Sequence, residues 1–319
     1  MRLIDMHCDT IYECAADGSE MRRNDKQVNF LSMKQQDAMA QFFAIFLFGE
    51  DGSTEEARAD YSWEAFLKYY NFYQEQLQLN RSLIRPAFSY TDILSHDKNG
   101  LMSSILAVEN GELIGTSLQR LKELFQKGVR LITLTWNSEN SLGFPCSSDP
   151  VRHQMGLKPF GFQAVELMNE LGIIVDVSHL SEGGFYDVAT HSKKPFVASH
   201  SSSRAITDHP RNLTDHQLRT LAEKGGVAGV NFYSGFLRND DSDHTTLDNI
   251  MAHLTHMVDI AGTDHIALGS DFDGIEGTVE VDGYRHYDLL VDQLMEQYPE
   301  KIVEKICYKN VLRIIKECM

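Results

Sequence analysis

The chain begins with a short apolar segment that ends in a histidine and an aspartate two residues apart. In Leu3-Ile4-Asp5-Met6-His7-Cys8-Asp9, His7 and Asp9 carry an imidazole and a carboxylate. Residues two apart in an extended segment point to the same side, so both side chains can reach one divalent metal ion. Cys8 points to the opposite side, and we expect it to be a buried neutral thiol. A His-x-Asp triplet also arises by chance, so its meaning depends on further ligands elsewhere.

Four later apolar segments also end in a side chain that binds metals or transfers protons. These side chains are Glu109, His179, His200 and Asp271. Histidine and aspartate are poor choices for the buried end of a strand unless something binds them. Taken alone, each histidine is more often a hydrogen-bonded core residue than a ligand. Six such groups at equivalent positions, counting His7 and Asp9, favour a metal site.

The other histidines do not share this placement. We expect most of them to be solvated, because they lie in loops or on helices: His96, His153, His191, His209, His216, His244, His253, His256 and His286. His253 and His256 are three apart on a predicted helix, a spacing that can bind a metal, but no further ligand converges there.

The donor set indicates the metal and the reaction. Three imidazoles with two or three carboxylates suit Zn²⁺, with Mn²⁺ or Co²⁺ as alternatives. One catalytic zinc ion takes three protein ligands and keeps an open position, so five ligands favour two ions that share a bridging carboxylate. Two ions about 3.5–4 Å apart ionise a bridging water and polarise a carbonyl. The set therefore predicts hydrolysis of an amide or ester.

The elements that position these residues alternate along the chain. Eight apolar segments are predicted as strands: 3–10, 41–48, 103–109, 130–136, 173–179, 195–200, 227–232 and 265–271. Helices are predicted mainly between and after them: 54–79, 118–127, 162–171, 213–224, 247–258, 287–297 and 300–316. Segment 137–161, rich in glycine, proline and serine, predicts a long loop and a lid over the site.

Eight strands alternating with helices indicate an α/β fold, a (β/α)8 barrel of the TIM type, as a single domain over residues 1–319. A doubly wound open sheet is the rival, but no glycine-rich phosphate-binding sequence follows any strand. In a barrel, the carboxyl ends of all strands meet at one mouth, where active sites lie. The six candidate groups would therefore come together.

Charge and cysteine content exclude several other classes of protein. The formal charge of −17 over 319 residues disfavours binding to nucleic acid or to an anionic membrane surface. The five cysteines are odd in number and show no CxxC spacing, which fits reduced thiols better than disulfides. The chain begins without a signal-peptide pattern, and no apolar run approaches ~20 residues. We expect a cytoplasmic protein.

Several ordered motifs together resemble the membrane (renal) dipeptidase family, a metallopeptidase branch of the amidohydrolase superfamily. The resemblance extends from residue 1 to about Ile315 and rests on these motifs: Asp5-Met6-His7-Cys8-Asp9, Val108-Glu109, Val175-Asp176-Val177-Ser178-His179, Ala198-Ser199-His200-Ser201, Asp208-His209-Pro210-Arg211-Asn212 and Gly269-Ser270-Asp271-Phe272-Asp273-Gly274. It implies a (β/α)8 barrel with two zinc ions and, in solution, a homodimer.

The resemblance also implies a role for each residue of the site. His7 and Asp9 would hold one zinc ion, His179 and His200 the other, and Glu109 would bridge them. Asp271 would take the proton of the attacking water and deliver it to the leaving amine, with Asp273 as the second choice. Arg211 would bind the terminal carboxylate of the substrate, for which a guanidinium fork is suited.

One position departs from the family pattern. Renal members carry a histidine after the Leu-Thr of the fourth strand, where it contacts the substrate, whereas this chain reads Leu134-Thr135-Trp136-Asn137. An indole has one N–H donor and no titratable charge near neutrality. We therefore expect Trp136 to shape the pocket and Asn137 to compensate at the substrate. The signal peptide and lipid-anchor segment of eukaryotic members are also missing, which indicates a soluble bacterial relative.

Three functions remain open at this point. The first is a zinc dipeptidase that accepts dipeptides, including those with a C-terminal D-residue. The second is a related amidohydrolase that acts on N-acyl amino acids or other small amides. The third is a metal-binding or scaffold protein that has lost catalysis, against which the full ligand set and Asp271 argue.

Overall fold

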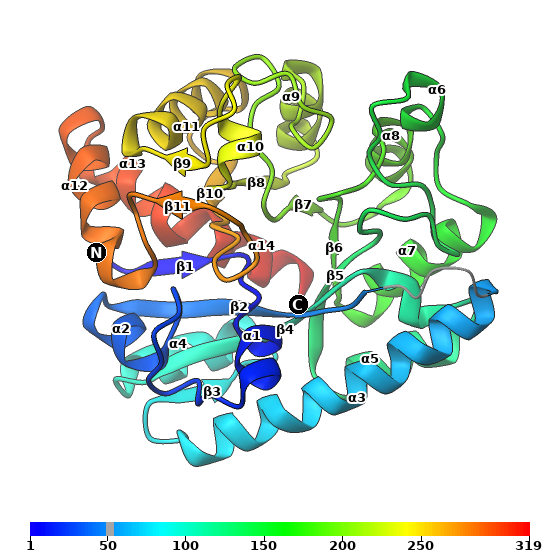
Figure 1. The fold of residues 1–319 in the computed structure, drawn as a ribbon, viewed down its shortest axis with the longest axis horizontal. Coiled ribbons are helices and arrows are strands. Elements are labelled where there is room, and N and C mark those ends of the chain that lie inside the picture. Colours follow the sequence, from blue (N-terminus) through cyan, green and yellow to red (C-terminus); the bar gives the residue numbers. More distant parts are fainter. Residues whose placement is uncertain (49–53) are drawn as a thin grey trace.

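The computed structural model describes residues 1–48 and 54–319, and its centre is a closed barrel of eight parallel strands (Figure 1). Around the barrel the strands follow one another in the order β2-β1-β10-β8-β7-β6-β5-β4, and β2 pairs with β4 to close the ring. The predicted (β/α)8 barrel is confirmed. The strands are β1 (Leu3–Asp5), β2 (Ala38–Phe46), β4 (Met102–Glu109), β5 (Val129–Thr133), β6 (Ile174–Asp176), β7 (Val197–Ala198), β8 (Val227–Val230) and β10 (Ile266–Leu268).

Three short strands were not predicted. β3 (Ile84–Pro86) pairs only with the first residues of β4, from Met102 to Ser104, while β5 pairs with β4 from Leu106 onward. β3 therefore lies beside the barrel and is not a ninth barrel strand. β9 (His244–Thr245) and β11 (Thr278–Val279) form a separate two-stranded parallel sheet.

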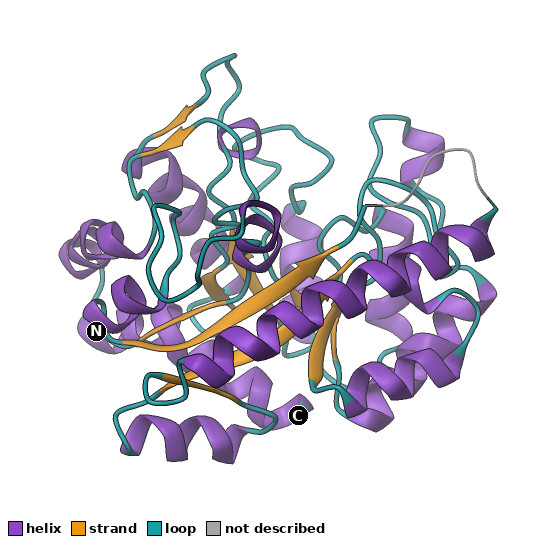
Figure 2. Ribbon diagram, turned by 60° about the horizontal axis from the view of Figure 1, so that its bottom comes forward, coloured by secondary structure: helices purple, strands orange, loops and turns teal. Residues whose placement is uncertain are grey.

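Helices flank the strands on both sides in Figure 2. The predicted helices are all present, with ends shifted by a few residues, and the long α3 is half-buried against the barrel. The helices are α1 (Thr10–Asp17), α2 (Phe30–Gln35), α3 (Glu55–Leu79), α4 (Tyr90–Lys98), α5 (Leu118–Gln126), α6 (Pro150–His153), α7 (Pro159–Leu171), α8 (Glu182–His191), α9 (Asp215–Glu223), α10 (Ser234–Leu237), α11 (Leu247–Ala261), α12 (Tyr287–Gln297), α13 (Glu300–Glu304) and α14 (Asn310–Cys318), with 3₁₀ turns at Gly111–Ile114 and Tyr284–His286 and a π-helical turn at Lys305–Lys309.

Helix α14 closes the amino end of the barrel. Its Val311, Ile314 and Ile315 are buried in one cluster with side chains from the strands, among them Ile4 and Ile174. Its Asn310 side chain donates to the carbonyl of Ile266, the first residue of β10, at 2.8 Å. Burial of this apolar surface closes the bottom of the barrel, so that only the carboxyl end remains as a mouth.

The predicted long loop is only partly a loop. Residues 150–153 form α6, and Asn140, Ser141 and Leu142 are buried. Asn140 donates to Leu134 O at 2.9 Å, which ties this part of the segment to the end of β5. The buried part of the predicted lid is therefore fixed to the barrel.

Two histidines that were expected at the surface are buried. His253 accepts a hydrogen bond from Ser203 N at 3.0 Å and lies 3.2 Å from Leu237 O. His153 accepts from Ser147 N at 3.2 Å. Both are exceptions to the expectation that most of these histidines are solvated, because the loop at Ser203 and the end of helix α10 cover His253 and the loop at Ser147 covers His153.

Candidate metal centre

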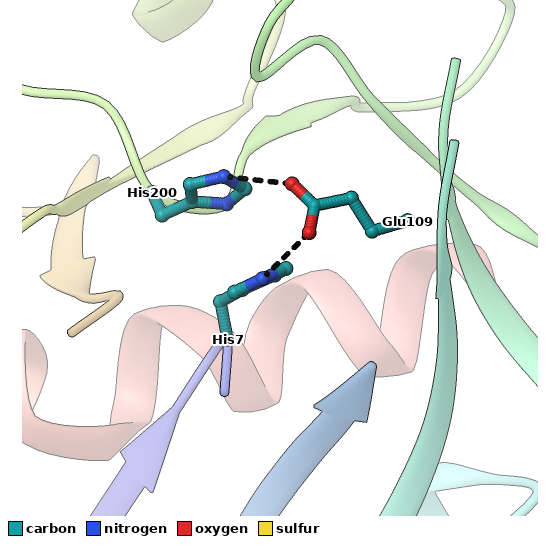
Figure 3. Close-up of side chains that lie close together, drawn as sticks. All are labelled: His7, Glu109 and His200. Atoms are coloured by element: carbon teal, nitrogen blue, oxygen red, sulfur yellow. Dashed lines mark ion pairs between the residues drawn. The ribbon is translucent and has the colours of Figure 1, made fainter. Parts of the chain in front are cut away.

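The six predicted groups lie together at the carboxyl end of the barrel, and Glu109 is at their centre. One oxygen of Glu109, Oε2, lies 3.4 Å from His7 Nε2. The other, Oε1, lies 3.1 Å from His179 Nε2 and 3.4 Å from His200 Nε2. Figure 3 shows the His7 and His200 rings next to each other, each facing a different oxygen of this carboxylate, and their ring centroids are 3.9 Å apart. Glu109 thus joins ligands from opposite sides of the barrel mouth.

Two further carboxylates surround His7. Asp9 Oδ2 lies 3.3 Å from His7 Nε2, and Asp271 Oδ1 lies 3.6 Å from the same nitrogen. Donor atoms of His7, Asp9 and Asp271 lie within 4.8 Å of one another, and so do those of His7, Glu109 and His200. All of these side chains are buried.

His7 and Asp9 converge where β1 leads into helix α1. The continuous ladder of β1 ends at Asp5, but Cys8 still forms a parallel bridge with Phe272, and Asp9 is the residue that precedes helix α1, with φ −104° and ψ 18°. The pairing at Cys8 is that of a strand, and the turn into the helix begins at Asp9. Cys8 does point away from the centre, with its Sγ near Phe42 O, and burial raises its pKa well above the usual value.

Two of the groups sit at strained backbone positions. His179 has φ +65° and Asp271 has φ +66°, a left-handed conformation that costs non-glycine residues on the order of 1–3 kcal/mol. Each residue follows a barrel strand by a few positions, after β6 and β10 respectively. Such strain is concentrated at functional sites because the surrounding structure holds the side chain in a required direction.

The charge of the metal-free centre is divided unevenly. Burial opposes a charge on His7, but Glu109 and Asp9 outweigh burial and hold the pKa of His7 well above its usual value. Burial and the nearby Arg211 lower the pKa of His179 to about 3, and burial and His7 lower that of His200. His179 and His200 are therefore neutral at pH 7, the form in which imidazole binds a metal.

The carboxylates of the centre are tuned in opposite directions. Burial raises the pKa of Asp9 to about 7, with Glu109 and Asp271 adding to the effect. Burial also opposes ionisation of Glu109, but the charge of His7 and the nearby imidazoles of His179 and His200 outweigh it and lower the pKa of Glu109 well below its usual value. The centre thus carries a fixed negative charge at Glu109, where a metal ion would be attracted.

Hydrogen bonds direct the Nε2 atoms of two histidines toward Glu109. His179 Nδ1 lies 3.1 Å from Asn137 Oδ1, and an amide oxygen can only accept, so His179 Nδ1 is the protonated nitrogen. His200 Nδ1 lies 2.7 Å from Ser199 Oγ, which donates to Asp176 Oδ2 at 2.6 Å. Ser199 can then only accept from His200 Nδ1. In both rings, Nε2 is left with the lone pair that a metal needs.

The polar atoms of the centre fit a metal ion. Among the described residues, neither nitrogen of His7 has a hydrogen-bond partner, nor has Asp9 Oδ1, although all three atoms are buried. Buried polar atoms without partners are costly in a protein interior. A divalent cation bound by imidazoles and carboxylates would satisfy one nitrogen of His7 and the Asp9 oxygen, and it would also hold together carboxylates that otherwise repel one another.

Two buried aspartates beneath the centre were not singled out from the sequence. Asp5 accepts from His7 N at 3.0 Å and from Ser270 N at 3.2 Å. Asp176 accepts from Ser178 N at 3.0 Å and from Ser199 N at 2.8 Å. The signal that pointed to them is an aspartate inside an apolar strand, because a buried carboxylate needs donors nearby.

The centre lies at the bottom of a pocket of about 560 Å³. One wall is aromatic, with Trp136 in edge contact with Phe46 and Phe48 at ring-centroid distances of 4.9 and 5.6 Å. As predicted, Trp136 lines the pocket. Asn137 also lines it, but its side-chain oxygen is next to His179.

Arg211 and Asp273 occupy more restricted positions than expected. The Arg211 side chain is buried, bonds Ser201 Oγ and His200 O at 3.1 Å each, and stacks over Phe236. Asp273 also lines the pocket, but its carboxylate accepts from Thr10 Oγ1 at 2.6 Å and from two backbone amides. Those bonds leave Asp273 poorly placed to move protons, which favours Asp271.

A parallel (β/α)8 barrel with imidazoles and carboxylates around its mouth defines a metal-dependent hydrolase. The family model for membrane dipeptidase (peptidase family M19) matches residues 1–319, and the chain belongs to this family. No helix among the described residues is long and apolar enough to cross a membrane.

Relatives of known sequence agree with this assignment. The chain is 36% identical over 243 residues to a Klebsiella pneumoniae protein described as lying in the pqqA 5′ region, covering 73% of this chain and 88% of that protein. It is 37% identical over 232 residues to the uncharacterised dipeptidase C965.12 of Schizosaccharomyces pombe, covering 70% of this chain. The matched region spans only 55% of the fission-yeast protein.

Two solved structures share the whole fold. A Rhodobacter sphaeroides metallopeptidase bound to a phosphinate mimic of the dipeptide L-Ala-D-Ala has a TM-score of 0.90 and 26% identity, covering 100% of this chain and 99% of that one. A metallopeptidase of family M19, the dipeptidase AC, has the same TM-score and identity, with 100% and 98% covered.

Proposed function

We propose that this protein is a zinc-dependent dipeptidase that hydrolyses the peptide bond of dipeptides, including those with a C-terminal D-residue. The observation that carries the proposal is the division of the Glu109 carboxylate, with Oε2 directed to His7 and Oε1 directed to His179 and His200. A carboxylate with one oxygen directed to each group suits two metal ions that share it. The similarity to a metallopeptidase bound to an L-Ala-D-Ala mimic supports the substrate class.

His7 and Asp9 would hold one zinc ion, His179 and His200 the other, and Glu109 would bridge them. When bound, the two ions lower the pKa of a water molecule and polarise the peptide carbonyl. Asn137 and the Ser199–Asp176 pair keep Nε2 of His179 and His200 free of protons for this purpose. Asn137, Ser199 and Asp176 therefore prepare the two imidazoles for metal binding before the substrate binds.

Asp271 would move the proton during hydrolysis. Its carboxylate lines the pocket, with Oδ1 directed toward His7 and Oδ2 held by Asn231 Nδ2 at 2.8 Å. A carboxylate in this position accepts a proton from the attacking water and returns it to the amine as the peptide bond breaks. One residue thus serves as base and then as acid.

Arg211 would bind the terminal carboxylate of the dipeptide. Its Nε has no partner among the described residues, and a buried guanidinium with a free donor favours an anionic ligand. The aromatic wall of Phe46, Phe48 and Trp136 would contact an apolar part of the substrate. The pocket of about 560 Å³ is of the size that small-molecule ligands occupy.

The deciding experiment compares substrates on zinc-reconstituted protein. We expect release of free amino acids from L-Ala-D-Ala and from other dipeptides, with loss of activity after chelation and recovery on addition of zinc. The second candidate, an amidohydrolase for N-acyl amino acids, is favoured only by Arg211, which would bind the terminal carboxylate of either kind of substrate. Hydrolysis of N-acetyl-D-alanine at a higher kcat/KM than of any dipeptide would replace the dipeptidase assignment.

The third candidate, a protein that binds metal without catalysis, is tested by the same assays. Protein that holds zinc but hydrolyses no small amide would establish it. The homodimer stays a prediction, which light scattering of the purified protein would check.

A further inference from the structure

Asn231 is the residue that follows β8, a barrel strand whose end supplies no predicted metal ligand. Its side chain is buried and lies between two parts of the centre. Nδ2 donates to Asp271 Oδ2 at 2.8 Å and lies 3.4 Å from His200 O. The sequence does not indicate Asn231 as a site residue, because an asparagine side chain is neither a usual metal ligand nor a titratable group.

The direction of the Asn231 amide is determined by its third contact. Oδ1 accepts from Tyr233 N at 2.6 Å, and a backbone N–H can only donate. The oxygen of the amide must therefore face Tyr233, and its NH₂ group must face Asp271 and the carbonyl of His200. Asn231 cannot turn its oxygen toward Asp271 without losing both sets of bonds.

The backbone at Asn231 is held as firmly as its side chain. Asn231 N donates to Ser202 Oγ at 3.2 Å, and Ser202 Oγ donates back to Asn231 O at 3.3 Å. The strands are closely packed at this level, since a Cβ added at Gly229 or at Gly269 would lie within about 2 Å of Ser199 O. These contacts leave little freedom for the amide to move away from Asp271.

We propose that Asn231 is a positioning residue that directs Asp271 toward the reacting atoms. The bond to Oδ2 engages one carboxylate oxygen and leaves Oδ1, which lies 3.6 Å from His7 Nε2, facing the centre. Without this donor, the Asp271 carboxylate can rotate about its Cβ–Cγ bond, since terminal torsions of this type are broad. A small error in the position of a reacting group costs much of the rate. The inference rests on the proposed dipeptidase function.

The test uses two variants of Asn231 in the zinc-loaded full-length protein. Asn231→Asp keeps the shape and loses the donor, and Asn231→Ala loses the donor without adding a charge, so failure of one variant to fold leaves the other. With L-Ala-D-Ala as substrate, we expect kcat to fall about 10- to 100-fold, while KM stays within about threefold and the zinc content is unchanged.

Asn310→Ala is the matched control. Asn310 is also a buried asparagine whose amide binds backbone carbonyls, but at the opposite end of the barrel. We expect it to lower the melting temperature and to leave kcat within about twofold of the wild-type value.

Three results would overturn the inference. The first is a folded, zinc-loaded Asn231 variant whose kcat is within about threefold of the wild-type value. The second is a loss of kcat that follows a loss of zinc, and the third is an equal loss of kcat in Asn310→Ala. If the wild-type protein hydrolyses no dipeptide, the proposed function itself fails, and the two failures are thereby distinguished.

Discussion

The two halves of the metal centre share one backbone design. In the β1–β10 half, which contains Asp5, His7, Asp9 and Asp271, Asp5 accepts from the amide two residues ahead and from the amide of Ser270, beyond β10. In the β6–β7 half, which contains Asp176, His179 and His200, Asp176 accepts from the amide two residues ahead and from the amide of Ser199, beyond β7. In each half, one buried carboxylate joins two strand ends.

The halves differ in the further bonds that these carboxylates make. The hydroxyl of Tyr287 donates to Asp5, and burial raises the pKa of Asp5 despite its hydrogen bonds. Asp176 accepts from the hydroxyls of Thr133 and Ser199, and together with the nearby imidazole of His200 these bonds lower its pKa against the effect of burial. Ser199 links Asp176 to the ring of His200, whereas no link joins Asp5 to the ring of His7.

This difference shows two ways to prepare a metal ligand. The β6–β7 half controls its imidazoles through hydrogen bonds that determine their tautomers. The β1–β10 half gathers carboxylates around His7, and neither ring nitrogen of His7 has a hydrogen-bond partner among the described residues. Removal of the buried carboxylate should therefore weaken metal binding in the β6–β7 half, where it is Asp176. In the β1–β10 half, where it is Asp5, removal should chiefly disturb the backbone.

The largest effect is expected at Glu109, the residue that contacts both halves. Glu109→Gln keeps the shape but removes the charge that lies near three imidazoles. We expect the zinc content to fall below one ion per chain and kcat/KM to fall by about 10³-fold or more. Elemental analysis together with an L-Ala-D-Ala assay measures both. Retention of two zinc ions would show that the halves are independent.

The second largest effect is expected at Asp271. Asp271→Asn should lower kcat by about 10²- to 10⁴-fold with little change in zinc content, because it removes the proton carrier and keeps its shape. Asp273→Asn is the control, since its carboxylate is engaged by Thr10 and two backbone amides. We expect its kcat to stay within about threefold. The reverse order of the two losses would reassign the acid/base role to Asp273.

The comparison between the halves is tested directly at Asp176 and Asp5. Asp176→Asn should weaken zinc binding about 10- to 100-fold, because it disturbs the support of His200 through Ser199. Asp5→Asn should lower the free energy of unfolding by about 1–3 kcal/mol and leave zinc affinity nearly unchanged. Competition with a zinc chelator and urea unfolding measure the two quantities. Equal effects of the two substitutions on zinc affinity would mean that the two halves do not differ in how they support their metal ligands.

The smallest effect is expected in the pH dependence of stability at His253, which supports the loop after β7 through Ser203. Burial lowers its pKa from 6.5 to about 4. The unfolded chain therefore binds the proton first, and this contribution to stability is lost as the pH falls from about 6.5 to 4. We expect His253→Gln to reduce the loss of stability between pH 7 and pH 5 by about 2 kcal/mol.

Urea unfolding of metal-free protein at the two pH values provides the measurement for His253. His256→Gln is the matched control, because His256 is on the same helix but is partly exposed beside Asp215. An unchanged pH dependence in His253→Gln would contradict the role assigned to its burial.

The sequence predicted the barrel and the ligands for the same physical reason. Strands buried on both faces are continuous apolar runs, and a polar group at the end of such a run stands out. The side chains of His7 and Asp9 do converge, although the continuous ladder of β1 ends at Asp5 and the pairing beyond it includes a bridge at Cys8. Strand β3 was missed because it has only three residues, includes a proline and pairs only with the start of β4.

Other features depend on contacts that no local pattern records. The partners of Asp5 include Tyr287, which is 282 positions away along the chain. Burial of His253 depends on loops from outside its own helix. Asn231 acquires its contacts from Asp271 and His200, which come from other strands. Such residues can be found only when the elements are assembled.

The central claim is that the two halves together hold two zinc ions and use them for dipeptide hydrolysis. The most direct test is to titrate metal-free protein with zinc and to measure L-Ala-D-Ala hydrolysis at each step. Activity should rise until two equivalents per chain are bound and then level off. Full activity at one equivalent, or two bound ions without hydrolysis, would contradict the account.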